Sequence, residues 1–128
     1  MSYLTTERAL QQMVGSIFPI VQVSDSELIF ENATDRYVFS HHQDCCEHVY
    51  IESIVGDIQD LVNTPILIAE ESTGDTPADS DASPCDSYTW TFYKFVTFKG
   101  YVDIRWLGES NGYYSESVDV EHTSKVPA

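Results

Sequence analysis

The run SYTWTFYKFVTFKGYVDIRWL, residues 87–107, restricts the possible folds of this chain more than any other feature. It is dense in aromatic and β-branched residues, which favour strands over helices. We expect two strands, 87–97 and 101–107, joined as a hairpin by a three-residue loop at 98–100 with Gly100 in its left-handed position. The sequence therefore predicts a β-rich domain organised around this hairpin.

Matching the apolar faces of the two strands sets the expected register. The faces assigned to the core carry Tyr88, Trp90, Phe92 and Val96 on the first strand and Val102, Ile104 and Trp106 on the second. This register pairs Val96 with Val102 and places Tyr93 beside Arg105 on the opposite face. We expect residues 113–118 to follow 101–107 as its next neighbour, although a tight turn at Asn111-Gly112 would shift that pairing.

The remaining chain predicts a single α+β domain, 1–128, formed by an antiparallel meander sheet or open barrel. Apolar spacing and Gly15 predict an N-terminal helix within 1–15, and Asp57 is the expected cap of a short central helix. We expect further strands at 18–23, 27–31, 36–40 and 66–70, a strand or turn at 48–54, a mobile acidic loop at 71–86 and a tail at 121–128.

The charge of the chain limits its partners. Six Lys and Arg oppose 21 Asp and Glu, a formal net charge of −15, which disfavours nucleic acid and anionic membranes as partners. The same charge suits simple solubility, a basic protein partner or mimicry of a polyanion. Three cysteines and the lack of a long apolar run lead us to expect a cytoplasmic, reduced protein.

One polar group of residues could form a binding site on the non-core face of the predicted hairpin. Arginine binds phosphate bidentately, tyrosine stacks on a base, and asparagine hydrogen-bonds a base edge. The residues that supply this chemistry are Arg105, Tyr93, Tyr113, Ser115 and Asn111. The alternative is that Arg105 forms an ordinary ion pair with an acid such as Asp103 or Glu116.

The cluster HHQDCCEH, residues 41–48, carries side chains that zinc accepts as ligands. Its cysteines are adjacent and no second pair follows at zinc-finger spacing, so a buried cysteine in a capped turn is the competing interpretation. Phosphate-binding, dinucleotide-binding and nucleophile motifs are absent from the sequence. We therefore expect neither an enzyme nor a cofactor.

Three strings, HHQDCCEHVYIESIVGDIQDLVNTPILIAEEST, SYTWTFYKF and IRWLGESNGYYSESV, resemble a widespread family of small phage and bacterial proteins catalogued as a domain of unknown function. The resemblance covers about residues 36–120. It implies a phage setting, in which small proteins without catalytic motifs are often counter-defence proteins. One such class comprises the anti-Thoeris and anti-CBASS sponges, which sequester cyclic ADP-ribose-type or cyclic nucleotide signals, commonly as oligomers.

If the chain is a sponge, the resemblance implies that Arg105 holds the pyrophosphate and that Asn111 and Ser115 bond the ribose or base. The stacking residues would be Tyr93, Tyr113, Tyr114 or Trp90, and the middle segment or a neighbouring subunit would add His42 and Tyr50. The expected function is therefore non-catalytic sequestration of a nucleotide signal by a homo-oligomer in the host cytoplasm. The alternative is an acidic inhibitor or DNA mimic that binds a basic host defence protein, such as a restriction or CRISPR effector.

Overall fold

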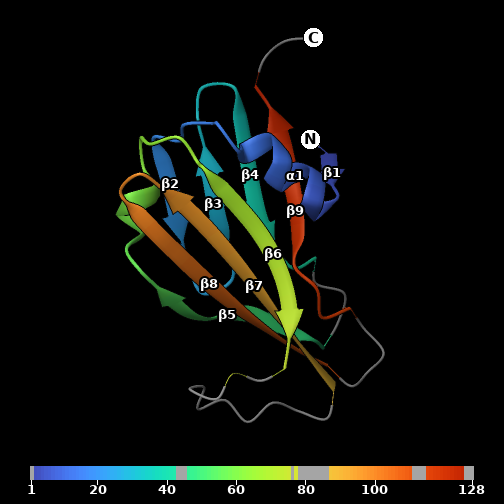
Figure 1. Cartoon of the computed structure of the whole chain (residues 1–128). Coiled ribbons are helices and arrows are strands. Elements are labelled where there is room, and N and C mark those ends of the chain that lie inside the picture. Colours follow the sequence, from blue (N-terminus) through green and yellow to red (C-terminus); the bar gives the residue numbers. More distant parts are fainter. Residues whose placement is uncertain (1, 43–45, 76, 78–86, 111–114, 126–128) are drawn as a thin grey trace.

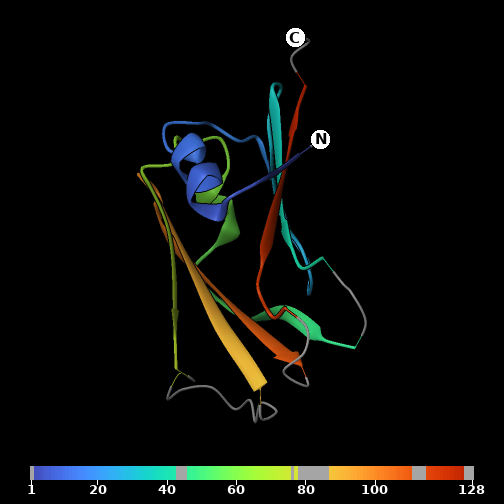
Figure 2. The ribbon, with the colours of Figure 1, turned by 90° about the vertical axis from the view of Figure 1, so that its right-hand side faces the viewer.

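The computed structural model describes residues 2–42, 46–75, 77, 87–110 and 115–125. Two open antiparallel sheets face each other, and helix α1 (Thr6–Met13) lies at one end between them (Figures 1 and 2). This confirms the predicted β-rich α+β class, and in the described residues the strands form two separate sheets rather than a barrel.

The first sheet has the order β1-β9-β4-β3-β2. Its strands are β1 (Ser2–Leu4), β2 (Ile20–Val23), β3 (Leu28–Glu31), β4 (Asp35–Ser40) and β9 (Asp119–Ser124). Strands β2, β3 and β4 form the predicted meander. Strand β9 enters from the far end of the chain and pairs with both β4 and β1.

The second sheet has the order β5-β8-β7-β6. Its strands are β5 (His48–Val55), β6 (Ile68–Gly74), β7 (Ser87–Thr97) and β8 (Gly100–Ser110). A short 3-10 helix, η1 (Ile58–Leu61), follows β5. Asp57 caps it by accepting a hydrogen bond from the Gln59 N–H at 2.9 Å, as the sequence predicts.

Aromatic side chains from both sheets form the core between them. Phe30 of β3 lies 4.9 Å from Phe95 of β7, and Phe39 of β4 lies 5.2 Å from Tyr93, between ring centroids. All four are at most 1% exposed. Aromatic pairs across a sandwich contribute both buried area and favourable edge-to-face geometry, so they fix how the two sheets face each other.

The predicted register of the central hairpin is wrong by one residue. Thr97 pairs with Gly100 across a two-residue turn, so Phe95 rather than Val96 lies opposite Val102. A shift of one residue exchanges the faces of a strand, and the inward face of β7 therefore carries Thr91, Tyr93, Phe95 and Thr97. Thr97 can face the core because its hydroxyl donates to the Asp60 carbonyl at 2.6 Å.

Helix α1 forms where the sequence places it. Thr5 caps the helix by accepting a hydrogen bond from the Arg8 N–H at 3.3 Å, and Ala9, Leu10 and Met13 are buried. Gly15 has a φ of 87°, a conformation that favours glycine, and turns the chain away just after the helix. The helix contacts β6 and β9, so it joins the two sheets at this end.

Three further segments differ from expectation. Residues 119–124, which include the start of the expected tail, form β9. The segment 71–74, expected within the acidic loop, continues β6, and the rest of that loop lies largely outside the described residues. The second neighbour of β8 is β5 rather than 113–118, because 115–118 is not a strand.

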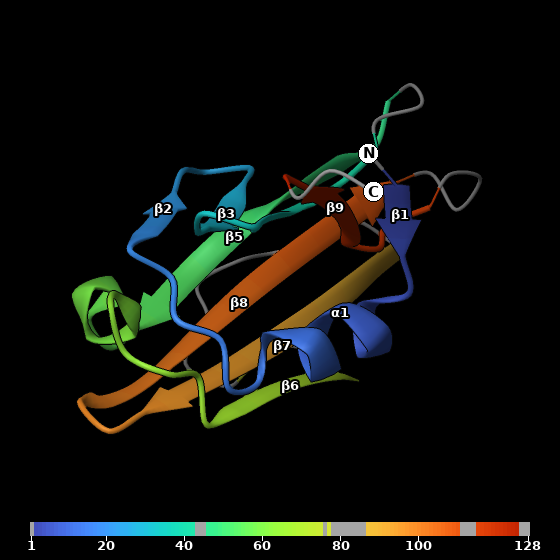
Figure 3. The same ribbon diagram turned by 90° about the horizontal axis from the view of Figure 1, so that it is seen from above.

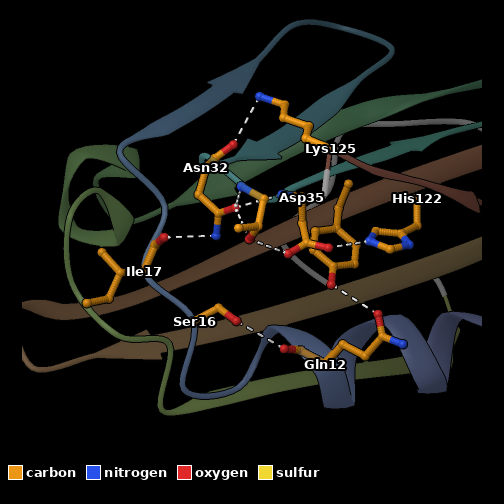
Figure 4. Close-up of polar contacts among 9 residues, drawn as sticks. Gln12, Ser16, Ile17, Asn32, Asp35, His122 and Lys125 are labelled. Carbon is orange, nitrogen blue, oxygen red and sulfur yellow. Dashed lines mark hydrogen bonds and ion pairs between the residues drawn. The ribbon is translucent and has the colours of Figure 1, made fainter. Parts of the chain in front are cut away.

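A polar network joins α1 and the segment after it to the first sheet, and joins Lys125, just after β9, to the β3–β4 turn (Figure 4). Asp35 accepts a 2.6 Å hydrogen bond from the His122 ring, and the Tyr37 hydroxyl bonds the Gln12 side chain at 3.0 Å. Partial burial raises the pKa of Asp35, but hydrogen bonds from Thr34 and His122 outweigh it and lower that pKa overall. These contacts join neighbouring elements, so we interpret the network as structural.

Candidate functional site

A cavity of about 560 Å³ opens between the two sheets beside the start of α1. Its lining comes from the residues before and within α1, the segment after β4, strands β6 and β7, and the start of β9 with the two residues before it. The lining residues are Thr5, Thr6, His42, Glu71, Thr73, Thr89, Thr91, Ser117, Val118, Asp119 and Val120. Six of these eleven residues carry hydroxyls and two carry carboxylates, so hydrogen-bonding groups are set among apolar atoms around the cavity.

The two carboxylates of the cavity are held by neighbouring groups. Glu71 accepts a 2.6 Å hydrogen bond from the Tyr93 hydroxyl, and Asp119 accepts one from the His42 N–H at 3.0 Å. Burial raises the pKa of Tyr93, and the hydrogen bond and negative charge of Glu71 raise it further. Tyr93 is therefore a neutral donor that orients Glu71 and leaves the second oxygen of that carboxylate available.

The segment 115–118 forms one rim of the cavity and is fastened to the second sheet by Glu116. The Glu116 carboxylate accepts hydrogen bonds from Ser87 at 2.5 Å, Thr89 at 2.9 Å and Ser110 at 2.5 Å. Burial raises the pKa of Glu116, but these three donors outweigh it and the pKa falls below its ordinary value. Its ionised form therefore stabilises the fold.

We expect Glu116→Gln to lose stability at neutral pH and to lose less as the pH falls. Because the folded pKa is depressed, the contribution of Glu116 is present above the unfolded value of 4.5 and disappears as the pH falls through the folded value. Urea unfolding of both proteins from neutral pH to about pH 3 tests this. Glu27→Gln, at an exposed turn, is the control, and a stability difference independent of pH would contradict the prediction.

A buried ion pair lies next to the cavity, within the segment 41–48. His41 Nε2 lies 2.9 Å from Glu47 Oε2, and His41 Nδ1 lies 2.8 Å from the Ser117 carbonyl oxygen. The two side chains are only 3% and 0% exposed. Burial lowers the pKa of His41, but hydrogen bonds to Glu47 and Ser117, with the charges of Glu47 and Asp119, raise it overall. Both ring nitrogens face acceptors, which fits a charged imidazolium.

The metal interpretation of 41–48 receives no support from the residues that the structure describes, where no three metal-ligating side chains converge. Cys46 is disulfide-bonded, in contrast to the reduced state expected from the sequence. Within this cluster, the contacts of His41 with Glu47 and with the Ser117 carbonyl fasten the start of β5 to the segment before β9.

Arg105 does not reach the cavity. It lies on the outer face of β8, because Ile104 and Trp106 on either side of it face the core. Its Nε and Nη2 donate to Glu52 Oε1 at 3.0 and 2.8 Å, and its guanidinium lies 5.7 Å from the centre of the Trp90 ring. Arg105 thus forms an ion pair, as the alternative interpretation of the sequence predicted, but its partner is Glu52 of β5 rather than Asp103 or Glu116.

The other predicted site residues divide between two places. Trp90 and Tyr50 lie on the same face as Arg105. Both pair with Leu107, which is two residues from Arg105 on β8 and therefore points to the same side of the sheet. His42 lines the cavity. Tyr93 is connected to the cavity by the hydrogen bond from its hydroxyl to Glu71, which is a lining residue. Ser115 is exposed and bonds the Ser117 hydroxyl. Asn111, Tyr113 and Tyr114 lie outside the described residues.

The comparisons with known proteins identify a family without naming an activity. Residues 7–120 match the family model described as "Domain of unknown function (DUF7448)". The chain belongs to this family. The match extends the predicted resemblance toward the N-terminus, through α1. Neither the curated proteins nor the solved structures contain a match to the chain. In the described residues, no helix is long and apolar enough to cross a membrane.

Proposed function

We propose that this protein is a non-catalytic binding module that accepts a cationic group of a partner protein in the cavity between its sheets. One observation carries the proposal: the lining described by the structure offers two carboxylates and six hydroxyls but neither lysine nor arginine. An ammonium or guanidinium group finds acceptors on several sides of such a cavity. A phosphate would instead face Glu71 and Asp119.

The overall charge acts in the same direction. A formal net charge of −15 attracts a basic surface over a distance and increases its rate of association. The volume of about 560 Å³ leaves ample room for a lysine or arginine side chain, whose aliphatic stem can pack on Val118 and Val120 while its head reaches Glu71 or Asp119. The partner's basic residue is thus the group that the cavity would select.

The two functions predicted from sequence receive unequal support. Nucleotide sequestration stays a prediction, and it would need a role for Arg105 other than its contact with Glu52 on the outer face. The acidic-inhibitor alternative uses the chemistry of the cavity directly, since it requires a basic protein partner. The phage counter-defence setting, the homo-oligomer and the cytoplasmic location likewise stay predictions.

Neutralising the cavity is expected to weaken cation binding. The double variant Glu71→Gln/Asp119→Asn keeps an acceptor oxygen for Tyr93 and for the His42 N–H, so the local hydrogen bonds are retained. We expect it to bind a capped pentalysine peptide about tenfold more weakly than the unaltered protein at low salt. Isothermal titration calorimetry of the purified proteins measures the two dissociation constants.

Asp25→Asn/Glu27→Gln is the charge-matched control, because it removes two carboxylates from the exposed β2–β3 turn. Binding that weakens equally in both double variants would reject the cavity as the site, because only overall charge would matter. Absence of pentalysine binding to the unaltered protein would reject the proposal as a whole. Binding of cyclic ADP-ribose that is lost in Arg105→Ala would instead support nucleotide sequestration.

A further inference from the structure

Strand β6 is an edge strand with an open side. It stands last in the second sheet and, among the described residues, pairs with β7 alone. Six of its seven residues are exposed. The backbone N–H and C=O groups on the open side of an edge strand can pair with an added strand. Figure 3 shows β6 at the margin of its sheet, with α1 alongside.

A groove follows this edge. Between α1 and β6 lies a hollow of about 470 Å³ lined by Glu7, Leu10, Gln11, Val14, Ala69, Glu70 and Glu71. Glu71 also lines the cavity between the sheets, where Thr73 continues along the same strand. The two hollows therefore adjoin at Glu71 and together accompany β6 from Ala69 to Thr73. A strand-shaped ligand fits this arrangement better than a compact one.

Charge indicates which strand would fit. The groove contributes Glu7, Glu70 and Glu71, and its described lining contains neither lysine nor arginine. A second copy of β6 would bring its own Glu70 and Glu71 against this edge, and like charges facing each other across strands are destabilising. A basic strand would be attracted. Charge complementarity therefore favours a different protein over a second copy of this chain.

We propose that an extended, lysine- or arginine-bearing segment of the partner pairs with the open edge of β6 and places one basic side chain beside Glu71. The proposal rests on the proposed function and adds the form of the partner. Side chains opposite Ala69 and Glu71 would point to the same face, because they are two residues apart. Leu10 and Val14 adjoin Ala69, so the partner segment should carry an apolar residue two positions from its basic one.

The test uses a palindromic peptide, acetyl-Thr-Lys-Thr-Val-Thr-Lys-Thr-amide, which presents this pattern in either strand direction. Two derivatives carry N-methyl groups, one on all the threonines and the other on the lysines and valine. Alternate N–H groups of a strand point to opposite edges, so strand pairing predicts that only one derivative loses affinity. We expect a loss of about tenfold or more in that derivative and a small change in the other.

Hydrogen exchange of the β6 amides provides a second readout, because strand pairing should newly protect those that point to the open edge. If both derivatives bind like the parent, edge pairing is wrong. The proposed function then survives provided that Glu71→Gln/Asp119→Asn still weakens binding. If neither this peptide nor pentalysine binds, both proposals fail. Protection of the edge amides that appears without peptide and disappears on dilution would identify a second copy as the occupant and overturn the proposal.

Discussion

Replacing Glu47 by alanine is expected to destabilise the protein by about 3–5 kcal/mol, the usual cost of leaving one member of a buried ion pair without its partner. The Glu47 side chain is 0% exposed and the His41 side chain only 3%, so the pair is shielded from bulk water in the intact protein. The His41 ring would keep its contact with the Ser117 carbonyl but lose the charge that raises its pKa. Urea unfolding monitored by tryptophan fluorescence measures the change in free energy.

The same pair predicts a pH dependence with a definite sign. Because the folded pKa of His41 is raised, its contribution to stability is fully present below the unfolded value of 6.5 and is lost as the pH rises through the folded value. Glu47→Gln should remove most of this dependence while preserving the size of the side chain. His48→Gln, at an exposed position, is the control. An unchanged pH profile in Glu47→Gln would show that the pair is not charged in the folded protein.

The sequence predicted the architecture better than the register. The buried face of strand β8 was assigned correctly, although the strand is three residues longer at its end than predicted, because Val102, Ile104 and Trp106 alternate regularly with Asp103 and Arg105. Strand β7 has bulky residues on both faces, so its periodicity does not decide which face is buried. The deciding contacts are tertiary: buried Thr91 and Thr97 lie on the core face, and the Thr97 hydroxyl bonds a carbonyl of η1. The residue pattern of strand β7 alone does not indicate that the Thr97 hydroxyl will find this carbonyl in the folded protein.

The candidate site was harder to predict for a related reason. Glu71 and Asp119 come from opposite sheets, and each is one of 21 acidic residues in the chain. Nothing local distinguishes them. Strand β9 was not predicted because its sequence, DVEHTS, contains only one apolar residue, Val120. One apolar residue cannot show the alternating pattern that indicates a strand. His42 and Tyr93 were named for other reasons and lie at the cavity, whereas Arg105, the most conspicuous residue in the sequence, is engaged by Glu52.

Gly108→Ala is expected to destabilise the protein and to disturb the cavity, because the segment 115–118 crosses close to this glycine. A Cβ atom at position 108 would overlap the Glu116 carbonyl oxygen and lie 2.9 Å from the Glu116 Cβ. The obstacle is backbone, which cannot rotate away as a side chain can. Overpacking of this kind typically costs about 1–3 kcal/mol. Relief requires 115–118 to move, and that movement would strain the three hydrogen bonds of Glu116 and shift Ser117 at the rim.

Gly74→Ala is the matched control, since Gly74 also lies in a strand of the second sheet but an added Cβ there would meet only Phe92 Cε2 at an ordinary 3.5 Å. Thermal unfolding should therefore show a clear loss for Gly108→Ala and little change for Gly74→Ala. Pentalysine titration of the folded Gly108→Ala protein distinguishes the effect on the cavity from the loss of stability. Weaker binding would link the position of 115–118 to the cavity. Unaltered stability in this variant would contradict the close approach itself, since a carbonyl oxygen and a methyl group cannot occupy the same space.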